Sequence, residues 1–174
     1  MLNDREISLI PISKNDTEFI INARNSINIF NNFFSDLPTY DFKHEKWLNS
    51  IDNSLDMIIY YNNQRSGRIS IYNIDYKNQK SEYGIFINNE YQGKGIAYRA
   101  SKLLISYVFS NLNLRKIYVH VFSNNLPAIK LYKKLGFEEE GVLKEETFKN
   151  GEYKNVIRMA IFRRSWLKTD ENPI

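Results

Sequence analysis

The chain has 174 residues, 43% hydrophobic and 14% aromatic, which is enough apolar surface for one domain with its own core. It contains no cysteine, so disulfides, thiolate metal sites and a cysteine nucleophile are excluded. The 24 basic and 20 acidic residues leave a net charge of +4. This mild excess of positive charge suits an anionic partner. The sequence has no block of basic residues, however, so nucleic-acid binding is not indicated.

Neither a targeting segment nor a membrane span is indicated. The first six residues lack the apolar region of a signal peptide, and no run approaches the ~18 apolar residues of a membrane span. No linker, repeat or low-complexity tract divides the chain. We therefore expect a cytoplasmic protein with a single domain over residues 1–168 and a short tail at 169–174, with no membrane or nucleic-acid partner.

The N-terminal third is predicted to start with a strand at residues 6–12, followed by short helices. Ser13 or Asn15 is a candidate cap for a first helix, whose apolar face carries Phe19, Ile20 and Ala23. A second short helical stretch and a turn at residues 36–38 follow. Asp41 is a candidate cap for a further helix. Its apolar stripe consists of His44, Trp47, Leu48 and Ile51.

The remaining elements alternate between strands and helices. Strands are predicted at residues 57–61, 68–74, 81–87 and 116–122, the first two joined by a polar turn at 62–67. A long amphipathic helix begins near Ile96, and a short helix carries Tyr132. Asn150-Gly151 favours a type I′ hairpin turn between two closing strands. The order predicts a mixed sheet with helices on both faces and one parallel crossover around the glycines.

Residues 91–97, Tyr-Gln-Gly-Lys-Gly-Ile-Ala, are suited to hold a pyrophosphate. Two glycines allow a tight turn, and the helix that follows directs its positive dipole end to the same point. A Walker-type loop is excluded because Asn88 and Gly95 stand where it needs Gly and Ser or Thr. A dinucleotide fingerprint would need a small residue where Tyr98 stands.

Residues 124–137 form a second motif, read as Asn-x-x-Ala-x-x-Leu-Tyr-x-x-x-Gly-Phe from Asn125. Asn125 is a good N-cap, Pro127 is tolerated in a first turn, and Gly136 is placed to close a short helix. These features explain a helix, but they do not explain why Asn125 and Tyr132 share it.

Together the two motifs resemble the GNAT N-acetyltransferases. The pattern Gln-x-x-Gly-x-Ala from Gln92 is similar to their acetyl-CoA pyrophosphate loop, and the motif from Asn125 is similar to their pantetheine-binding helix. The likeness is strongest over residues 82–162. It implies the α/β GNAT fold, in which a mixed central sheet splays between two adjacent strands, with acetyl-CoA as cosubstrate.

The resemblance also implies roles for particular residues. Tyr132 is the candidate general acid for the CoA thiolate, and Glu82 is the candidate general base, acting directly or through water. Cofactor binding is expected from the backbones of Ile85 and Ile87 and from Gln92, Gly93, Lys94, Gly95, Ile96, Ala97, Asn125 and Tyr132. No cluster has metal-ligand spacing, so no metal site is expected.

The two histidines and the fold allow other roles. His120 is expected to be packed or hydrogen-bonded rather than a base, and His44 with Trp47 is a candidate wall of an acceptor pocket. A silent acyl-CoA-binding regulatory domain and a nucleic-acid-associated domain are the non-enzyme alternatives. The presence of Asn125 and Tyr132 beside the glycine loop favours an enzyme.

The amine acceptor is the least determined feature. Residues 136–141, with 150–153 and 158–159, resemble ribosomal-protein and spermidine N-acetyltransferases. Arg24-Asn25-Ser26 with His44-x-x-Trp47 resembles bacterial amino-sugar N-acetyltransferases. Because the chain is net basic, an amino-sugar nucleotide is placed ahead of a protein N-terminus, with spermidine third. A homodimer is left open.

Overall fold

The computed structural model describes residues 1–35 and 38–168, so the predicted tail and most of the predicted turn at 36–38 lie outside it. The strands are β1 (Leu2–Asp4), β2 (Ile7–Pro11), β3 (Leu55–Tyr61), β4 (Gln64–Asp75), β5 (Lys80–Ile87), β6 (Lys116–Phe122), β7 (Glu138–Lys149) and β8 (Glu152–Phe162). The α-helices are α1 (Thr17–Asn25), α2 (Ile27–Phe30), α3 (Asp41–Leu48), α4 (Ile96–Asn111), α5 (Leu126–Lys134) and α6 (Arg163–Trp166), with 3-10 turns at Lys14–Asp16 and Asn89–Tyr91.

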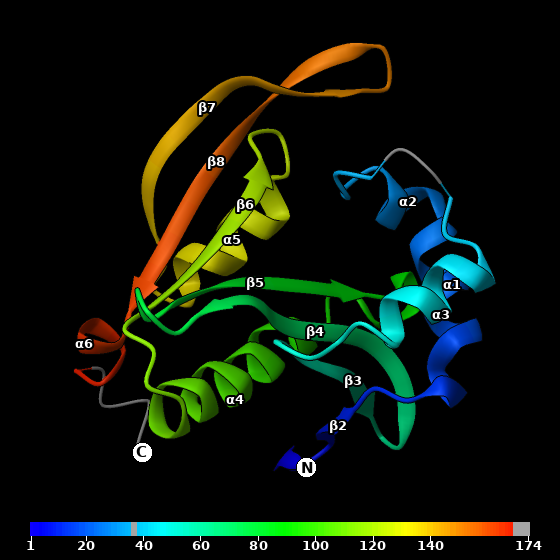
Figure 1. Cartoon of the computed structure of the whole chain (residues 1–174), viewed down its shortest axis with the longest axis horizontal. Coiled ribbons are helices and arrows are strands. Elements are labelled where there is room, and N and C mark those ends of the chain that lie inside the picture. The colour runs from blue at the N-terminus through cyan, green and yellow to red at the C-terminus, as the bar shows by residue number, and fades with distance from the viewer. Residues whose placement is uncertain (36–37, 169–174) are drawn as a thin grey trace.

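The strands form a single mixed sheet, as the sequence predicts. Their order is β1-β2-β3-β4-β5-β6-β8-β7, and β5 and β6 are the only parallel neighbours among the described residues (Figure 1). Helix α4 connects these two strands, which confirms the predicted crossover. No described helix is both long enough and apolar enough to cross a membrane.

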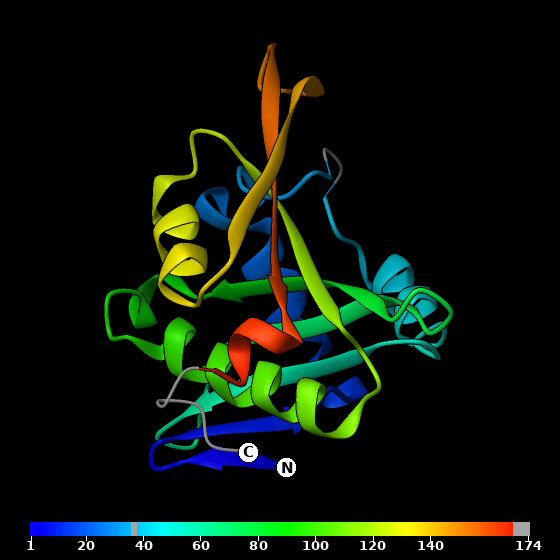
Figure 2. The ribbon, with the colours of Figure 1, turned by 90° about the vertical axis from the view of Figure 1, so that its left-hand side faces the viewer.

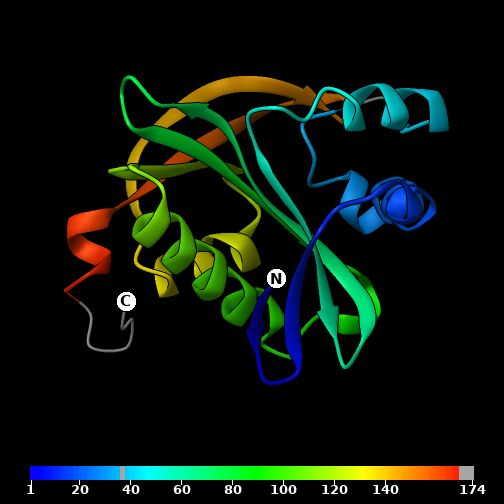
Figure 3. The same ribbon diagram turned by 60° about the horizontal axis from the view of Figure 1, so that its bottom comes forward.

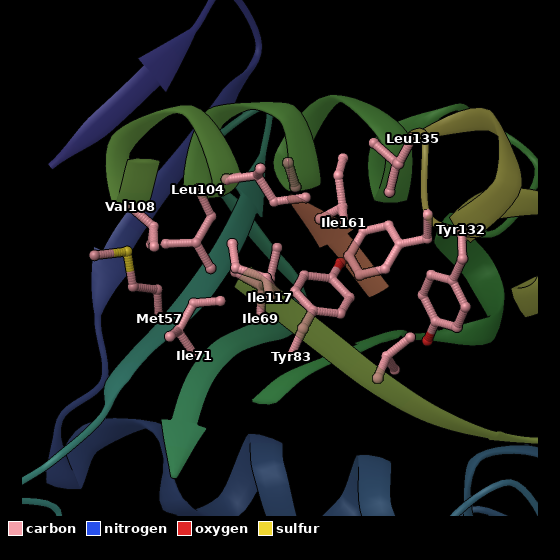
Figure 4. Close-up of a cluster of buried hydrophobic side chains, with 14 of the residues drawn as sticks. Met57, Ile69, Ile71, Tyr83, Leu104, Val108, Ile117, Tyr132, Leu135 and Ile161 are labelled. Atoms are coloured by element: carbon pink, nitrogen blue, oxygen red, sulfur yellow. The ribbon is translucent and has the colours of Figure 1, made fainter. Parts of the chain in front are cut away.

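Alternation along the strands divides the core between the two faces of the sheet. Ile69 and Ile71 of β4 pack in a large cluster beneath α4, which Figure 4 shows extending from Met57 to Tyr132. Ile58 and Phe86 point to the other face and pack against α1 and α2. Figure 3 shows α4 on one side of the strands and α1 to α3 on the other. Arg68, Ser70 and Tyr72 of β4, which alternate with Ile69 and Ile71, therefore lie on the face that carries α1 to α3.

The helix caps follow the local sequence. Ser13 forms a capping box with Asp16 before α1, and the Asn125 side chain accepts the Ala128 N–H at the start of α5. Gly136 has φ +90° just after α5, as expected of a closing residue. Asn150 and Gly151 have φ +52° and +84°, which confirms the predicted hairpin turn (Figure 2).

Three local predictions are wrong. The polar turn at 62–67 is confined to Asn62 and Asn63, both at positive φ, because two asparagines suffice to close the hairpin and β4 then begins at Gln64. Tyr40 is the N-cap of α3, so Asp41 is its first residue and not its cap. The helix ends at Leu48, so Ile51 lies outside it. In addition, the sequence analysis misses strand β1, because its three residues carry no alternating apolar pattern.

Candidate active site

Strands β5 and β6 separate after a short paired segment. Their parallel ladder covers only Lys80 to Glu82 on β5 and Lys116 to Tyr118 on β6. Beyond it, β5 continues beside β4 and β6 continues beside β8 (Figure 1). The facing edges are left with unpaired backbone groups, which an amide-containing ligand can bind as a further strand would. This is the splayed sheet that the resemblance implies.

The glycine loop lies where the splayed strands lead into α4. Gly93 and Gly95 have φ +76° and +73°, a conformation that L side chains rarely adopt. A Cβ built on either glycine meets no atom within 4 Å, so open space lies beside the loop. Gly95 caps α4 without a side-chain hydrogen bond, and the first turn holds no acidic residue. The N-terminal N–H groups are therefore available to an anion.

Gln92 and Lys94 affect the glycine loop through their side chains, whereas the two glycines set its backbone conformation. The Gln92 side chain donates to the Ile87 carbonyl at 3.0 Å and to Asn89 Oδ1 at 3.2 Å, which ties the loop to the end of β5. Lys94 is exposed, with its Nζ 5.1 Å from the centre of the Tyr91 ring. Gln92 thus positions the loop, and Lys94 adds an exposed positive charge beside it.

A cavity of about 670 Å³, here called the loop cavity, joins the two sequence motifs. It is lined among others by Ile85, Ile87, Gln92, Gly93, Gly95, Ile96, Ala97, Asn125 and Tyr132. Every residue expected to bind the cofactor therefore lines it except Lys94. The Oδ1 of Asn125 is engaged in the helix cap, so its amide nitrogen is the group left for a ligand.

A second cavity of about 520 Å³, here called the arginine cavity, lies beside α1, α3 and β4. Arg24, Trp47, Arg68 and Tyr72 are part of its lining. The two cavities share Asn32, Phe33, Ile85, Phe86, His120 and Tyr132. They therefore meet where β5 and β6 separate.

Tyr132 stands at this junction. Its side chain is 6% exposed and packs edge-on against Tyr83, with ring centres 6.0 Å apart. Burial raises the pKa of the Tyr132 hydroxyl well above its ordinary value, so the group stays protonated. A neutral hydroxyl at the meeting point of two cavities is suited to donate a proton.

Glu82 lines neither cavity but is connected to both through His120. Its carboxylate oxygens lie 2.9 Å from His120 Nδ1 and 3.0 Å from Asn73 Nδ2. Because a carboxylate can only accept, the proton of a neutral His120 ring is assigned to Nδ1, which leaves a lone pair on Nε2. The expectation that His120 is hydrogen-bonded is confirmed, yet the ring also lines both cavities.

Trp47 lines the arginine cavity, whereas His44 lies behind it. The His44 residue is 2% exposed, its ring is 5.0 Å from the Trp47 ring, and its Nε2 is buried without a hydrogen-bond partner among the described residues. Burial, followed by the charges of Arg68 and Arg24, lowers the pKa of His44. His44 therefore supports the wall and is neutral near pH 7.

This buried imidazole predicts a specific dependence of stability on pH. The folded-state pKa of His44 lies below the unfolded value of about 6.5, so the unfolded chain takes up the proton first as pH falls. His44 thus adds to stability above that pH and loses the contribution below it. When the pH is lowered from 7.5 to 5.5, the free energy of unfolding should fall less for His44→Gln than for the wild type, by at most about 1.4 kcal/mol per pH unit. Urea denaturation at each pH measures this free energy. Parallel stability curves would contradict this assignment.

Comparison with known proteins agrees with this geometry. Residues 23–137 match the Acetyltransferase (GNAT) family. The chain is 32% identical to spermidine N(1)-acetyltransferase of Escherichia coli (strain K12), over 99% of this chain and 95% of that protein. It is 35% identical to the spermidine N(1)-acetyltransferase of Vibrio cholerae, over 95% and 98% of the two chains. A crystal structure of spermidine N-acetyltransferase from Vibrio cholerae in complex with CoA and spermine has a TM-score of 0.89 at 32% identity, covering 95% of this chain and all of that one.

The chain therefore belongs to the GNAT acetyltransferase family and is an acetyl-CoA-dependent N-acetyltransferase. The family, the mixed fold and acetyl-CoA as cosubstrate are confirmed, and the non-enzyme alternatives are set aside. Both of these bacterial relatives are spermidine N(1)-acetyltransferases, whereas the net positive charge of the chain predicts spermidine as the least favoured acceptor. The roles of individual residues stay predictions.

Proposed function

We propose that this enzyme transfers acetyl directly from acetyl-CoA, bound in the loop cavity, to the primary amine of a small molecule bound in the arginine cavity. The observation that carries the proposal is the position of Tyr132, which lines both cavities. Two substrates bound in these cavities would meet at that side chain, so transfer needs no covalent enzyme intermediate.

The proposed reaction has three proton and bond changes. The amine loses a proton to a base as its nitrogen attacks the thioester carbonyl, which forms a tetrahedral oxyanion. The oxyanion collapses, and the bond from carbon to sulfur breaks. The departing thiolate takes a proton from the Tyr132 hydroxyl, which then regains one from solvent. The products are an N-acetylated amine and CoA.

We assign the base role to His120 and a positioning role to Glu82. His120 lines both cavities, whereas Glu82 holds Nδ1 and so leaves the Nε2 lone pair for the amine proton. This proposal differs from the sequence-based predictions, in which Glu82 is the base and His120 is a packed or hydrogen-bonded residue. In the proposed arrangement the His120 ring lies between the Glu82 carboxylate and the substrate.

Substitution of His120 tests the assignment. His120→Gln should lower kcat by about a hundredfold at most, because water can also accept the proton, and leave KM for acetyl-CoA unchanged. Glu82→Gln should have a smaller effect and should displace the pH–rate profile, since the ring loses its charged partner. Steady-state kinetics between pH 6 and 9 measure both.

The comparison between the two variants is decisive. If Glu82→Gln lowers kcat more than His120→Gln, Glu82 itself is the base and His120 only packs beside it. Asn73→Ala removes a further hydrogen bond to Glu82 but leaves the contact between Glu82 and His120 in place. Because Asn73 also lines the arginine cavity, the kcat of this variant is compared at saturating acceptor, where it should stay above that of Glu82→Gln.

Two classes of small-molecule acceptor are supported by different observations. A polyamine is supported by the spermidine N-acetyltransferases that the chain resembles over nearly its whole length. An amino-sugar nucleotide is supported by Arg24 and Arg68 in the acceptor wall, because a polycation would be repelled there. Release of CoA with a panel of 4-amino-sugar nucleotides, polyamines and ribosomal-protein N-terminal peptides tests the proposal. Absence of turnover with every small amine would refute it.

A further inference from the structure

The arginine cavity carries positive charge from two different elements. Arg24 lies in the last turn of α1 and Arg68 lies on β4, and both line the cavity. Burial and the charge of Arg68 lower the pKa of Arg24, which reflects how close the two guanidinium groups are. Holding two like charges in one wall is unfavourable unless something compensates for them.

The carboxylates of the wall compensate only one of the two charges. Asp56, whose side chain is 2% exposed, pairs with Arg68 Nη2 and also accepts the Ser54 hydroxyl at 2.6 Å. Asp52 also lines the cavity but is exposed, so solvent and salt screen it.

Arg24 has no such partner. Within residues 1–35 and 38–168, no carboxylate lies at ion-pair distance from it, and no hydrogen bond occupies its guanidinium. Its guanidinium carbon lies over the Phe33 ring, 4.8 Å from the centre. One partly buried positive charge therefore faces the cavity with its hydrogen-bond donors unused.

Arg68 is held rigidly beside it. The guanidinium lies 4.7 Å from the centre of the Trp47 ring, and the side chain is 14% exposed. A guanidinium that is fixed by a carboxylate and an aromatic face loses little conformational entropy when it also contacts a ligand.

The basic end of the cavity is separated from its catalytic end. Arg68, Ser70 and Tyr72 alternate onto one face of β4, and Tyr72 is opposite Glu82 on β5. Four residues of strand place Arg68 about 13 Å from Tyr72. An acceptor with its amine near His120 and Tyr132 would therefore extend its far end toward the arginines.

We propose that Arg24 and Arg68 bind a phosphate group at the end of the acceptor remote from its reacting amine, and thereby select a phosphate-bearing amine over a polycation. This inference rests on the proposed function of the arginine cavity. Guanidinium groups bind phosphate oxygens through charge-assisted hydrogen bonds, and Trp47 and Phe33, which also line the cavity, add apolar surface beside a sugar or base ring.

Kinetics with matched acceptors test the selection. The acceptors are a uridine-diphosphate-linked 4-amino sugar, the same amino sugar without the nucleotide, and spermidine. Arg24→Gln should lower kcat/KM for the nucleotide by about tenfold to a hundredfold, mainly through KM, and should not lower it for spermidine. Arg24→Lys should retain part of the activity because the charge remains. The exposed Arg5, outside both cavities, provides the control Arg5→Gln.

A binding measurement that needs no turnover separates this inference from the proposed function. With CoA saturating, so that the glycine loop is filled, uridine diphosphate should raise the melting temperature of the wild type but not of Arg24→Gln. Such a shift would support the phosphate site even if no amine in the panel were acetylated. An equal shift in both proteins would overturn the inference, as would better turnover of spermidine than of the nucleotide by the wild type.

Discussion

Replacing Tyr132 with phenylalanine is expected to lower turnover by about a hundredfold or more while leaving acetyl-CoA affinity intact. The change removes one hydroxyl, so the edge-on packing against Tyr83 and the tilted packing against Phe137 are preserved. What is lost is the proton for the departing thiolate, and this loss affects the transition state only. Release of CoA and thermal shift with acetyl-CoA measure the two quantities separately.

A matched control comes from the same cavity. Tyr98 lines the loop cavity, and its ring packs against the Lys134 ammonium at 4.5 Å. Tyr98→Phe also removes a hydroxyl, but away from the junction of the cavities, so it should retain nearly full turnover. Wild-type turnover in Tyr132→Phe would reduce Tyr132 to a packing residue. Equal losses in both variants would point to a general disturbance of the cavity.

The parts of the site that the sequence predicted are those built from local geometry. Gly93 and Gly95 are at positive φ because the loop must turn before α4, and a glycine pattern reports such a turn directly. Asn125 and Tyr132 share one helix, so their spacing alone fixes their relation. The crossover from β5 through α4 to β6 follows from chain order.

The parts that the sequence did not predict depend on contacts between distant residues. Glu82 meets His120 because the parallel register sets Glu82 opposite Tyr118, and no local pattern specifies that register. Asp56, Arg68 and Trp47 likewise come together from β3, β4 and α3. Alternation on β4 assigns Arg68 to a face, but only the packing of α1 and α3 brings Arg24 and Trp47 to it.

The same contrast explains why the acceptor is harder to assign than the cofactor. The loop cavity is lined largely by the two sequence motifs, the glycine loop before α4 and the residues around α5, each of which is a continuous segment of the chain. The arginine cavity is lined by residues of α1, α3 and strands β3 to β6, which lie far apart in the sequence, and one substitution there changes the charge that an acceptor meets. Overall likeness to spermidine enzymes and the local charge of this wall can therefore point to different acceptors. Kinetics of Arg24 variants address that difference directly.

A single charge at the glycine loop should abolish cofactor binding. Acetyl-CoA at about 100 times its Kd should stabilise the wild type by about 2.7 kcal/mol, or roughly 5–10 °C in melting temperature. In Gly95→Asp, a carboxylate would lie within a few ångströms of the pyrophosphate. At an effective dielectric constant of about 20, that repulsion costs about 4 kcal/mol at 4 Å and exceeds the stabilisation.

The variant Gly95→Asn distinguishes the effect of a negative charge at position 95 from the effect of side-chain bulk. Aspartate and asparagine are nearly isosteric, both tolerate the φ of +73° at this position, and a Cβ there meets no atom within 4 Å. Both variants should therefore fold, with similar melting temperatures in the absence of ligand. With acetyl-CoA, Gly95→Asn should keep a measurable part of the wild-type shift, whereas Gly95→Asp should show none. A full shift in Gly95→Asp at millimolar acetyl-CoA would mean that the pyrophosphate binds elsewhere, and equal partial losses would mean that bulk, not charge, is what this loop excludes.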